Sequence, residues 1–316
     1  MKEDPCKIEH QKAYGHENMV RVEEVDPRTS VLIFDDIRTV WVVRDRHNTL
    51  IETSHPAEFP EVLAGLRALS LRPEDIDYLA VTHIHIDHAG GAGHLAEANP
   101  SLRIFVHEAG LRHLLDPSRL MEGVRAAYGE DFAVVGRMRP VPSPEMLVAV
   151  GSGDRIELGE TVLEVYETPG HARHHVVFFD RERSCVYAGD ALGSFYPDHP
   201  NFVLAPPPDY DPGEAKRSID LVRSLQPRQI RFTHLGPRDL DGTDAFYENL
   251  KAKHDLWNER LREIAEEHPD LDHRGFFEMF LERVPEVRDY PDNYFSFNLS
   301  VKGILTHLRK SGRLKT

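Results

Sequence analysis

Residues 82–88 read Thr-His-Ile-His-Ile-Asp-His, and they place four side chains that commonly bind metals in one short stretch. An apolar run at residues 76–81 comes before them and predicts a buried strand. Gly90 and Gly91 come after them and predict a turn. Imidazole and carboxylate groups packed this densely suit a borderline divalent metal such as zinc. The stretch therefore predicts a metal site where a strand runs into a loop.

The spacing inside this stretch predicts two groups of ligands. Side chains alternate along an extended chain, so His83 and His85 should point the same way. Asp87 and His88 come from the following turn and should point in a different direction. This arrangement predicts two adjacent metals, each taking two ligands from one loop.

The bulk properties predict an ordinary globular protein. A length of 316 residues is enough for a full core and one or two domains, and 40% of the residues are hydrophobic and 29% charged. No stretch approaches the roughly 18 apolar residues of a membrane span. Residues 1–18 lack the apolar segment of a signal peptide. We therefore expect a cytoplasmic protein without a membrane partner.

The formal net charge of -15 argues against nucleic acid as a partner. This net charge does not exclude a small anionic substrate, because two divalent cations would leave the metal site itself with a surplus of positive charge. Cys6 and Cys185 are too few for a disulfide framework or a thiolate metal cage. The expected partner is a small-molecule substrate, anionic ones included, and a homodimer stays open.

Hydrophobic patterning divides the chain into two halves with similar order, strands first and helices after them. Strands are expected at residues 20–25, 30–34, 39–43, 49–53, 103–106, 154–158, 161–167, 174–180, 184–188 and 229–232. Helices are expected at residues 57–69, 91–98, 107–115, 117–128, 212–225, 244–267, 273–284 and 300–310. Asp211, Pro212 and Glu214 predict a capped helix start. Residues 129–150 and 196–211 are Pro-rich, and we expect them to be loops that wall a pocket.

Three further polar residues each follow a predicted strand directly. They are His171 in Thr-Pro-Gly-His, Asp190 in Gly-Asp, and His234 in Thr-His. A glycine before a ligand lets the backbone turn sharply and approach a metal. Loops that follow strands converge on one edge of a sheet, so these residues are candidates for the same site.

Together with residues 82–88, these motifs resemble the signature of the metallo-β-lactamase superfamily, and the resemblance covers about residues 20–240. It implies an α/β fold, a four-layer αββα sandwich with two metals at one edge between the sheets. Residues 1–19 would be a polar arm, and residues 20–242 the catalytic domain. Residues 243–316 would be a helical extension packed on the core, similar to the helical additions of glyoxalase II-like members.

The resemblance also implies a role for each candidate ligand. The first metal would be held by His83, His85 and His171. The second would be held by Asp87, His88 and His234. Asp190 would bridge the two metals, and Asp87 would also orient the attacking hydroxide, which makes these two carboxylates the catalytic candidates.

A ligand set of this kind predicts hydrolysis. Two metals about 3.5–4 Å apart can share a hydroxide near neutral pH, so no side-chain nucleophile is required. The leading hypothesis is a dinuclear hydrolase of a small ester, lactone or thioester, with zinc as the expected metal and iron or manganese as alternatives. Two other functions stay open: a non-heme iron enzyme that uses oxygen, similar to persulfide dioxygenases, and a small phosphodiesterase.

Other residues near these motifs have supporting or packing roles as alternatives. His174 and His175 could support the ligands from behind or only fill space. Tyr196 could donate a hydrogen bond to a substrate oxygen, although packing is favoured. Glu52 stands in Ile-Glu-Thr-Ser, where the superfamily usually has Ile-Asp-Thr-Gly, and we expect it to support the site without binding metal. His254 is expected to be a core or surface residue.

Overall fold

The computed structural model describes most of the chain: residues 20–34, 38–129, 132–196, 199–202, 209–234, 237–239, 245–285 and 293–314. The expected arm at residues 1–19 lies outside these ranges. Within them, no helix combines the length and the apolar character that crossing a membrane requires.

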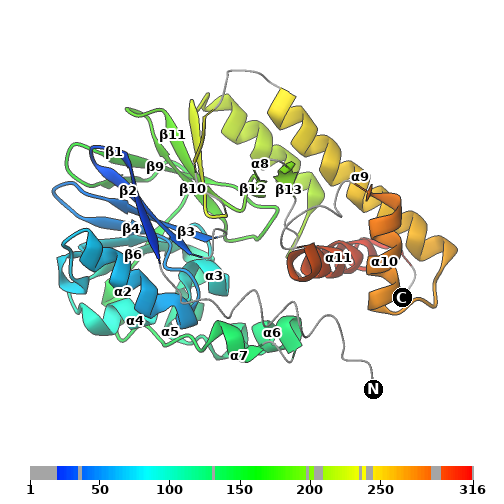
Figure 1. The fold of residues 1–316 in the computed structure, drawn as a ribbon, viewed down its shortest axis with the longest axis horizontal. Coiled ribbons are helices and arrows are strands. Elements are labelled where there is room, and N and C mark those ends of the chain that lie inside the picture. The colour runs from blue at the N-terminus through cyan, green and yellow to red at the C-terminus, as the bar shows by residue number, and fades with distance from the viewer. Residues whose placement is uncertain are drawn as a thin grey trace.

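The first sheet has seven strands that lie in chain order, β1 to β7 (Figure 1). Their bounds are Arg21–Asp26, Thr29–Phe34, Arg38–Val43, Thr49–Ile51, Tyr78–Ala80, Arg103–His107 and Leu147–Val150. Neighbours are antiparallel from β1 to β4 and parallel from β4 to β7. β2 and β3 are buried at almost every position, which explains why they read as continuous apolar runs.

The second sheet has six strands in the order β15-β14-β11-β10-β9-β8. In chain order, from β8 to β11 and then β14 and β15, the bounds are Arg155–Glu157, Val162–Glu167, Val176–Asp180, Cys185–Gly189, Gln229–Phe232 and Pro237–Asp239. β11 and β14 are parallel, so the loops that follow them emerge at the same edge. A separate ribbon pairs β12 (Ser194–Tyr196) with β13 (His199–Phe202).

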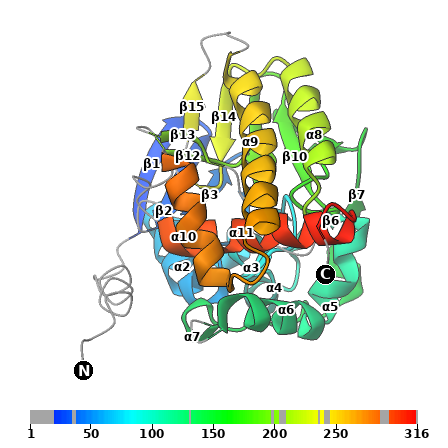
Figure 2. The same cartoon turned by 90° about the vertical axis from the view of Figure 1, so that its right-hand side faces the viewer.

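Helices cover the outer faces of both sheets (Figures 1 and 2). In chain order, from α2 to α11, they span Phe59–Ala68, Ile86–Ala89, Ala92–Ala98, Leu111–Leu115, Ser118–Tyr128, Phe132–Val135, Pro212–Ser224, Ala245–Glu267, His273–Arg283 and Asn293–Lys310. The predicted start of α8 is confirmed, since the side chain of Asp211 accepts a hydrogen bond from the backbone of Glu214 at 2.9 Å.

Three apolar clusters separate the four layers. One fills the space between the sheets and contains Trp41, Phe178 and Tyr187. A second lies between the first sheet and helices such as α2 and α4. The third joins the second sheet to α8, α9, α10 and α11. The expected αββα sandwich is therefore confirmed. The division at residues 242 and 243 stays a prediction, although one apolar cluster joins the C-terminal helices to the second sheet.

Four local expectations were wrong. Residues 129–150 are not one loop, because they contain α7 and the edge strand β7, which is too short to show periodicity. Residues 194–196 and 199–202 form the β12–β13 ribbon, where a loop was expected from residue 196 onward. β4 ends at Ile51 and does not reach residue 53, because Glu52 has a φ of 71°, which a strand cannot accommodate. α11 begins at Asn293, earlier than expected.

Candidate metal centre

The candidate ligands follow the ends of four strands. These strands belong to both sheets, and their ends meet at one edge of the sandwich. The stretch 82–88 follows β5 of the first sheet. His171, Asp190 and His234 follow β9, β11 and β14 of the second sheet. The structure therefore brings all seven predicted residues together from segments far apart in the chain.

The ligand stretch itself differs from the expectation in one respect. Asp87 and His88 lie on the one-turn helix α3 and not on an open turn. The buried side chain of Ile86 anchors this helix in the apolar cluster against the first sheet. Successive residues on a helix point about 100° apart, so the two side chains approach the site from different directions.

Three imidazoles converge at one end of the site. Nδ1 of His85 lies 2.9 Å from Nε2 of His83 and 2.9 Å from Nε2 of His171. Oδ2 of Asp190 lies 3.2 Å from Nε2 of His171. Three ring nitrogens and a carboxylate oxygen thus face one small volume.

A second group converges on the other side of Asp190. Its Oδ2 lies 3.3 Å from Nε2 of His88, and its Oδ1 lies 3.3 Å from Nε2 of His234. Oδ2 of Asp87 lies 3.5 Å from Nε2 of His234 and 3.7 Å from Nε2 of His88. The Asp190 carboxylate therefore stands between two groups of nitrogen and oxygen ligands.

The polar atoms of this cluster need a partner that the described side chains do not supply. Nε2 of His88, Nε2 of His234 and Oδ1 of Asp190 are buried and form no hydrogen bond. Leaving such atoms unsatisfied costs about 1–3 kcal/mol each. Divalent cations would satisfy them, and imidazole with carboxylate suits zinc, iron or manganese. Cys185 is buried and free, and the cluster contains only nitrogen and oxygen ligand atoms.

The protonation states favour cation binding. Burial and the neighbouring imidazoles hold the pKa of His83 and His85 well below the usual value, so both rings keep a free lone pair. Burial opposes the charge of Asp190, but the imidazoles of His88 and His171 outweigh it and lower the pKa of that carboxyl well below its usual range.

His88 shows the opposite behaviour. Burial would lower its pKa, but the carboxylates of Asp190, Asp87 and Glu52 outweigh burial and raise it well above the usual value. This end of the site therefore demands positive charge. A divalent cation would meet that demand in place of the imidazole proton.

Glu52 supports His88 from behind, which agrees with its expected role. Oε1 of Glu52 lies 3.2 Å from Nδ1 of His88 and also accepts a hydrogen bond from the hydroxyl of Thr82. That hydroxyl is 3.0 Å from Nδ1 of His83. Contacts of this kind fix the orientation of ligand imidazoles, so Nε2 of His88 is turned toward the site.

His174 and His175 have different surroundings. His175 is buried and contacts the backbone of Asp190, with its Nε2 3.0 Å from that amide nitrogen. The ring centroid of His174 lies 5.9 Å from that of His85, and its Nδ1 is buried without a hydrogen bond. The side chains of Tyr196 and His199 lie outside the described part of the chain.

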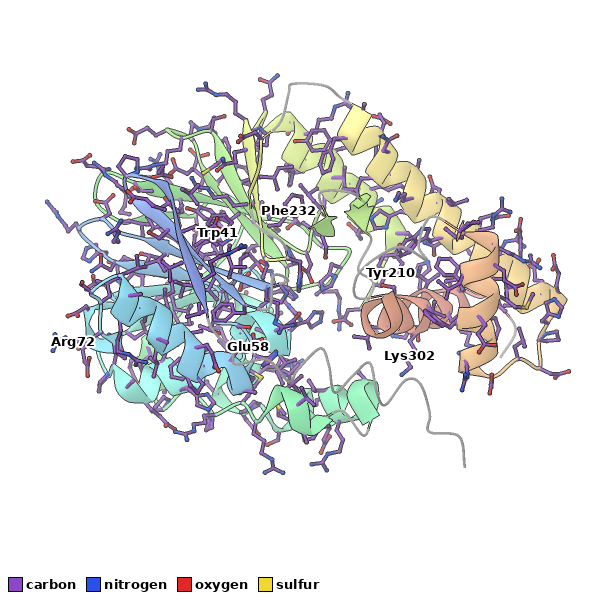
Figure 3. The ribbon with its side chains drawn as sticks, in the orientation of Figure 1. Trp41, Glu58, Arg72, Tyr210, Phe232 and Lys302 are labelled. Carbon is purple, nitrogen blue, oxygen red and sulfur yellow. The ribbon has the colours of Figure 1, made fainter. Side chains whose placement is uncertain are left out.

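One buried network beside the site was not predicted. Arg38 binds Glu58 through Nε at 3.1 and 3.0 Å, and Nε2 of His55 lies 3.4 Å from Oε1 of the same carboxylate. The backbone of Arg38 forms an isolated bridge with His234. Glu58 is labelled in Figure 3. The only sign of this network in the sequence is the loop of Ser54, His55 and Pro56, and the loop does not indicate which residues contact it.

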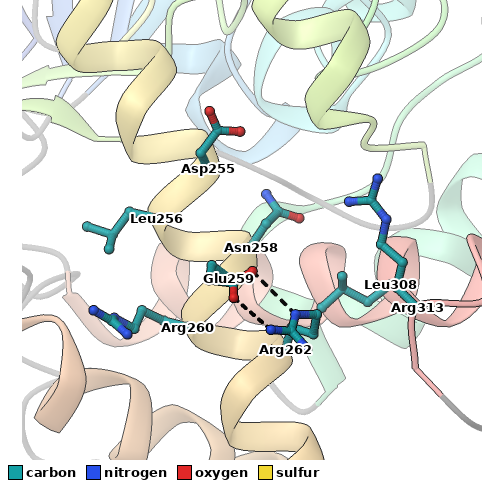
Figure 4. A pocket seen from close by; sticks show the side chains of 8 residues that line it. All are labelled: Asp255, Leu256, Asn258, Glu259, Arg260, Arg262, Leu308 and Arg313. Atoms are coloured by element: carbon teal, nitrogen blue, oxygen red, sulfur yellow. Dashed lines mark hydrogen bonds and ion pairs between the residues drawn. The ribbon is translucent and has the colours of Figure 1, made fainter.

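A further depression lies on the helical extension, between α9 and the end of α11 (Figure 4). Its volume is about 420 Å³. Much of its charge is already neutralised, because Arg262 pairs with Glu259 and Arg260 pairs with Glu263. It contains none of the seven candidate ligands.

Comparison with known proteins identifies similar chains. A protein-family model described as the metallo-beta-lactamase superfamily matches residues 33–234. An acyl-coenzyme A thioesterase of Gallus gallus is 33% identical over 169 residues, which are 48% of this chain and 57% of that protein. A hydroxyacylglutathione hydrolase of Nostoc punctiforme is 27% identical over 181 residues, 56% of this chain and 54% of that protein. The chain thus spans about half the length of these curated relatives.

Solved structures share the fold. A metallo-beta-lactamase family protein of Thermus thermophilus, TTHA1429, superposes with a TM-score of 0.63 at 22% identity, over 93% of both chains. At this level of identity, the likeness concerns the arrangement of the chain and not its activity.

Proposed function

This chain belongs to the metallo-β-lactamase superfamily, and from that premise we propose that it is a dinuclear metal hydrolase of a small ester, lactone or thioester. The observation that carries the proposal is the position of Asp190. Its Oδ2 lies 3.2 Å from Nε2 of His171 in the first group and 3.3 Å from Nε2 of His88 in the second, and its Oδ1 lies 3.3 Å from Nε2 of His234. A carboxylate in that position suits a bridge between two cations.

The ligand roles follow from the two groups. In our proposal the first metal is held by His83, His85 and His171. The second is held by Asp87, His88 and His234, and Asp190 is shared by both. The expected metal is zinc, and iron and manganese suit the same nitrogen and oxygen ligands.

Two bound cations would supply Lewis acidity and a water that loses its proton near neutral pH. The side chains have separate tasks. Asp190 stays ionised and holds the two ligand groups at a fixed separation. Asp87, ionised as well, accepts a hydrogen bond from the attacking water and orients it. The support from Glu52 keeps the His88 lone pair facing inward.

Among the described residues, the seven side chains of the cluster are imidazoles and carboxylates, and none is a thiol or a hydroxyl. Cys185 lies at the opposite end of β11 from Asp190, and burial raises the pKa of its thiol to about 12, so no thiolate forms at neutral pH. The hydroxyls of Thr82 and Thr168 are already engaged with Glu52 and His175. This supports direct attack by water and argues against a covalent intermediate with the protein.

The substrate class is supported by the curated relatives. One is described as an acyl-coenzyme A thioesterase and the other as a hydroxyacylglutathione hydrolase, and both names denote cleavage of a thioester. We therefore place thioesters first and lactones and other small esters second. The net charge of -15 makes a nucleic-acid substrate a poor alternative.

The test is a panel of thioesters, lactones, aryl esters and phosphodiesters, assayed with the reconstituted protein while its metal content is quantified. Hydrolysis should depend on added metal and be lost in His85→Ala and Asp190→Ala, both of which should remain folded. His268→Ala is the matched control, because this half-exposed side chain lies at the end of α9, away from the cluster. Unchanged turnover in either ligand variant would refute the proposal. One iron per chain with oxygen uptake would instead identify a dioxygenase.

A further inference from the structure

His175 lies behind the metal centre and is buried without any exposed surface. It is separated from the candidate ligand His171 by one turn of chain. Its ring contacts Gly189, the last residue of β11, and Asp190, which follows it. A buried polar side chain at this place either fills space or holds a neighbour in position.

The hydrogen bonds of the ring show which of its atoms acts on which neighbour. The backbone amide of Asp190 donates to Nε2 of His175 at 3.0 Å. A backbone amide can only donate, so Nε2 must carry a lone pair, and in the neutral ring the proton sits on Nδ1. Nδ1 lies 2.8 Å from the hydroxyl oxygen of Thr168 and donates to it.

The backbone before Asp190 leaves little room for alternatives. Gly189 has a φ of 49°, and a Cβ at this position would lie 2.7 Å from Nε2 of His175 and 2.4 Å from Oγ1 of Thr82. The chain is therefore held between the His175 ring on one side and the Thr82 hydroxyl on the other. Its direction at this point determines where the Asp190 carboxylate projects.

We infer that His175 is a positioning residue, which fixes the bridging carboxylate of Asp190 through its backbone amide and so sets the affinity for the two cations. The same ring ties the Thr168 loop, which leads to His171, to the strand end that carries Asp190. One side chain thus links a ligand of the first cation to the ligand shared by both. The inference rests on the proposed two-metal site and does not depend on the substrate.

A purely apolar role for His175 makes a different prediction. If the ring only filled space, any side chain of similar volume would serve, and the position of its polar atom would not matter. The two ring nitrogens can be tested separately. The amide of glutamine reaches the place of Nε2, and that of asparagine reaches the place of Nδ1.

The experiment compares His175→Gln with His175→Asn in the full-length protein loaded with Zn²⁺ or Co²⁺. Affinity is measured by competition with a chelator, and the geometry of the site by the visible absorption of bound Co²⁺. Neither readout requires a substrate, so failure of the hydrolase proposal would not obscure the result. Near-ultraviolet circular dichroism of the metal-stripped variants reports folding.

We expect His175→Asn to weaken metal binding by roughly 10–100-fold and to alter the Co²⁺ spectrum, as loss of a supporting contact does in metal sites. His175→Gln should stay within about 3-fold of the parent, because its oxygen still accepts from the Asp190 amide. Equal affinity in both variants, or equal loss in both, would overturn the inference. If the asparagine variant does not fold, Thr168→Val provides the test. It removes the acceptor for Nδ1 and should weaken binding by several-fold, and an unchanged affinity would again overturn it.

Discussion

Lowering the pH should destabilise the protein through His254, a buried imidazole of α9 that is only 5% exposed. Its Nδ1 is 2.8 Å from the hydroxyl of Tyr210, and that hydroxyl accepts a hydrogen bond from the side-chain amide of Asn258 at 3.0 Å. Burial lowers the pKa of His254 from 6.5 to about 4. The folded protein therefore binds fewer protons here than the unfolded chain, and the imidazole stays neutral in the native state at pH 7.

The sign and size of the effect follow from this difference. The stability that the neutral His254 ring contributes is fully present above pH 6.5 and is lost as the pH falls from 6.5 to 4. Below pH 4 this group causes no further loss. Each unit between the two pKa values corresponds to about 1.4 kcal/mol, so full protonation would cost about 3 kcal/mol. Between pH 7.5 and pH 5.0, the loss through His254 alone should be about 2 kcal/mol.

Urea unfolding of the full-length protein at a series of pH values measures this loss. Other histidines titrate in the same window, so the comparison is with His254→Asn, whose amide oxygen can still accept from Tyr210 but does not titrate. The variant will be less stable at pH 7.5, yet its stability should fall by about 2 kcal/mol less on acidification. Parallel curves for the two proteins would refute the assignment of a neutral buried imidazole.

Three further predictions concern single residues. Glu52→Gln should weaken metal binding by about 10-fold in a chelator competition while leaving the fold intact, because the amide keeps the contacts but loses the charge; an unchanged affinity would contradict the role of this carboxylate. Arg231→Met should lower the free energy of unfolding in urea by about 3 kcal/mol, because the guanidinium is 3% exposed and lies 2.6 Å from Oδ2 of Asp26; a loss below about 1 kcal/mol would contradict this. Gly170→Ala should reduce metal content and stability, because a Cβ there would lie 2.3 Å from the backbone of α8. The control is Gly153→Ala, which is also at positive φ but has no atom within 4 Å of the added Cβ, and its effect should be milder. Equal effects of the two substitutions would show that the backbone conformation, and not the steric clash, decides the outcome.

Much of the candidate site could be predicted because its signals are local. His171 and Asp190 each follow a strand and a glycine, and those features are visible within five residues of sequence. The stretch 82–88 holds four possible ligands, so it predicts a metal site without information from any other segment. Parallel pairing of β11 and β14 then brings Asp190 and His234 to one edge, which strand order alone does not reveal.

The supporting contacts could not be predicted because each joins residues that are distant in the chain. Arg38 and Glu58 are twenty positions apart, and their pairing depends on β3 and α2 meeting beside the site. His175 looks like any other histidine until the amide of Asp190 is placed against it. Periodicity also fails for short elements. β7 has four residues, and its Leu-Val-Ala-Val sequence carries no alternation that would separate it from a loop.

Backbone hydrogen bonds join the two sheets at the edge that carries the candidate ligands. Thr39 of β3 donates to the carbonyl of Thr233 at 2.7 Å, and Val176 of β10 donates to the carbonyl of Thr82 at 2.8 Å. Nearby, the indole of Trp41 donates to the carbonyl of Phe232 at 3.1 Å (Figure 3).

Each of the residues just before a ligand, at positions 82 and 233, is thus tied to the opposite sheet. A cation arriving between the sheets would meet ligands already held in place, and less ordering would oppose binding. The hydrogen bonds between the two sheets therefore help to position the ligands that follow residues 82 and 233.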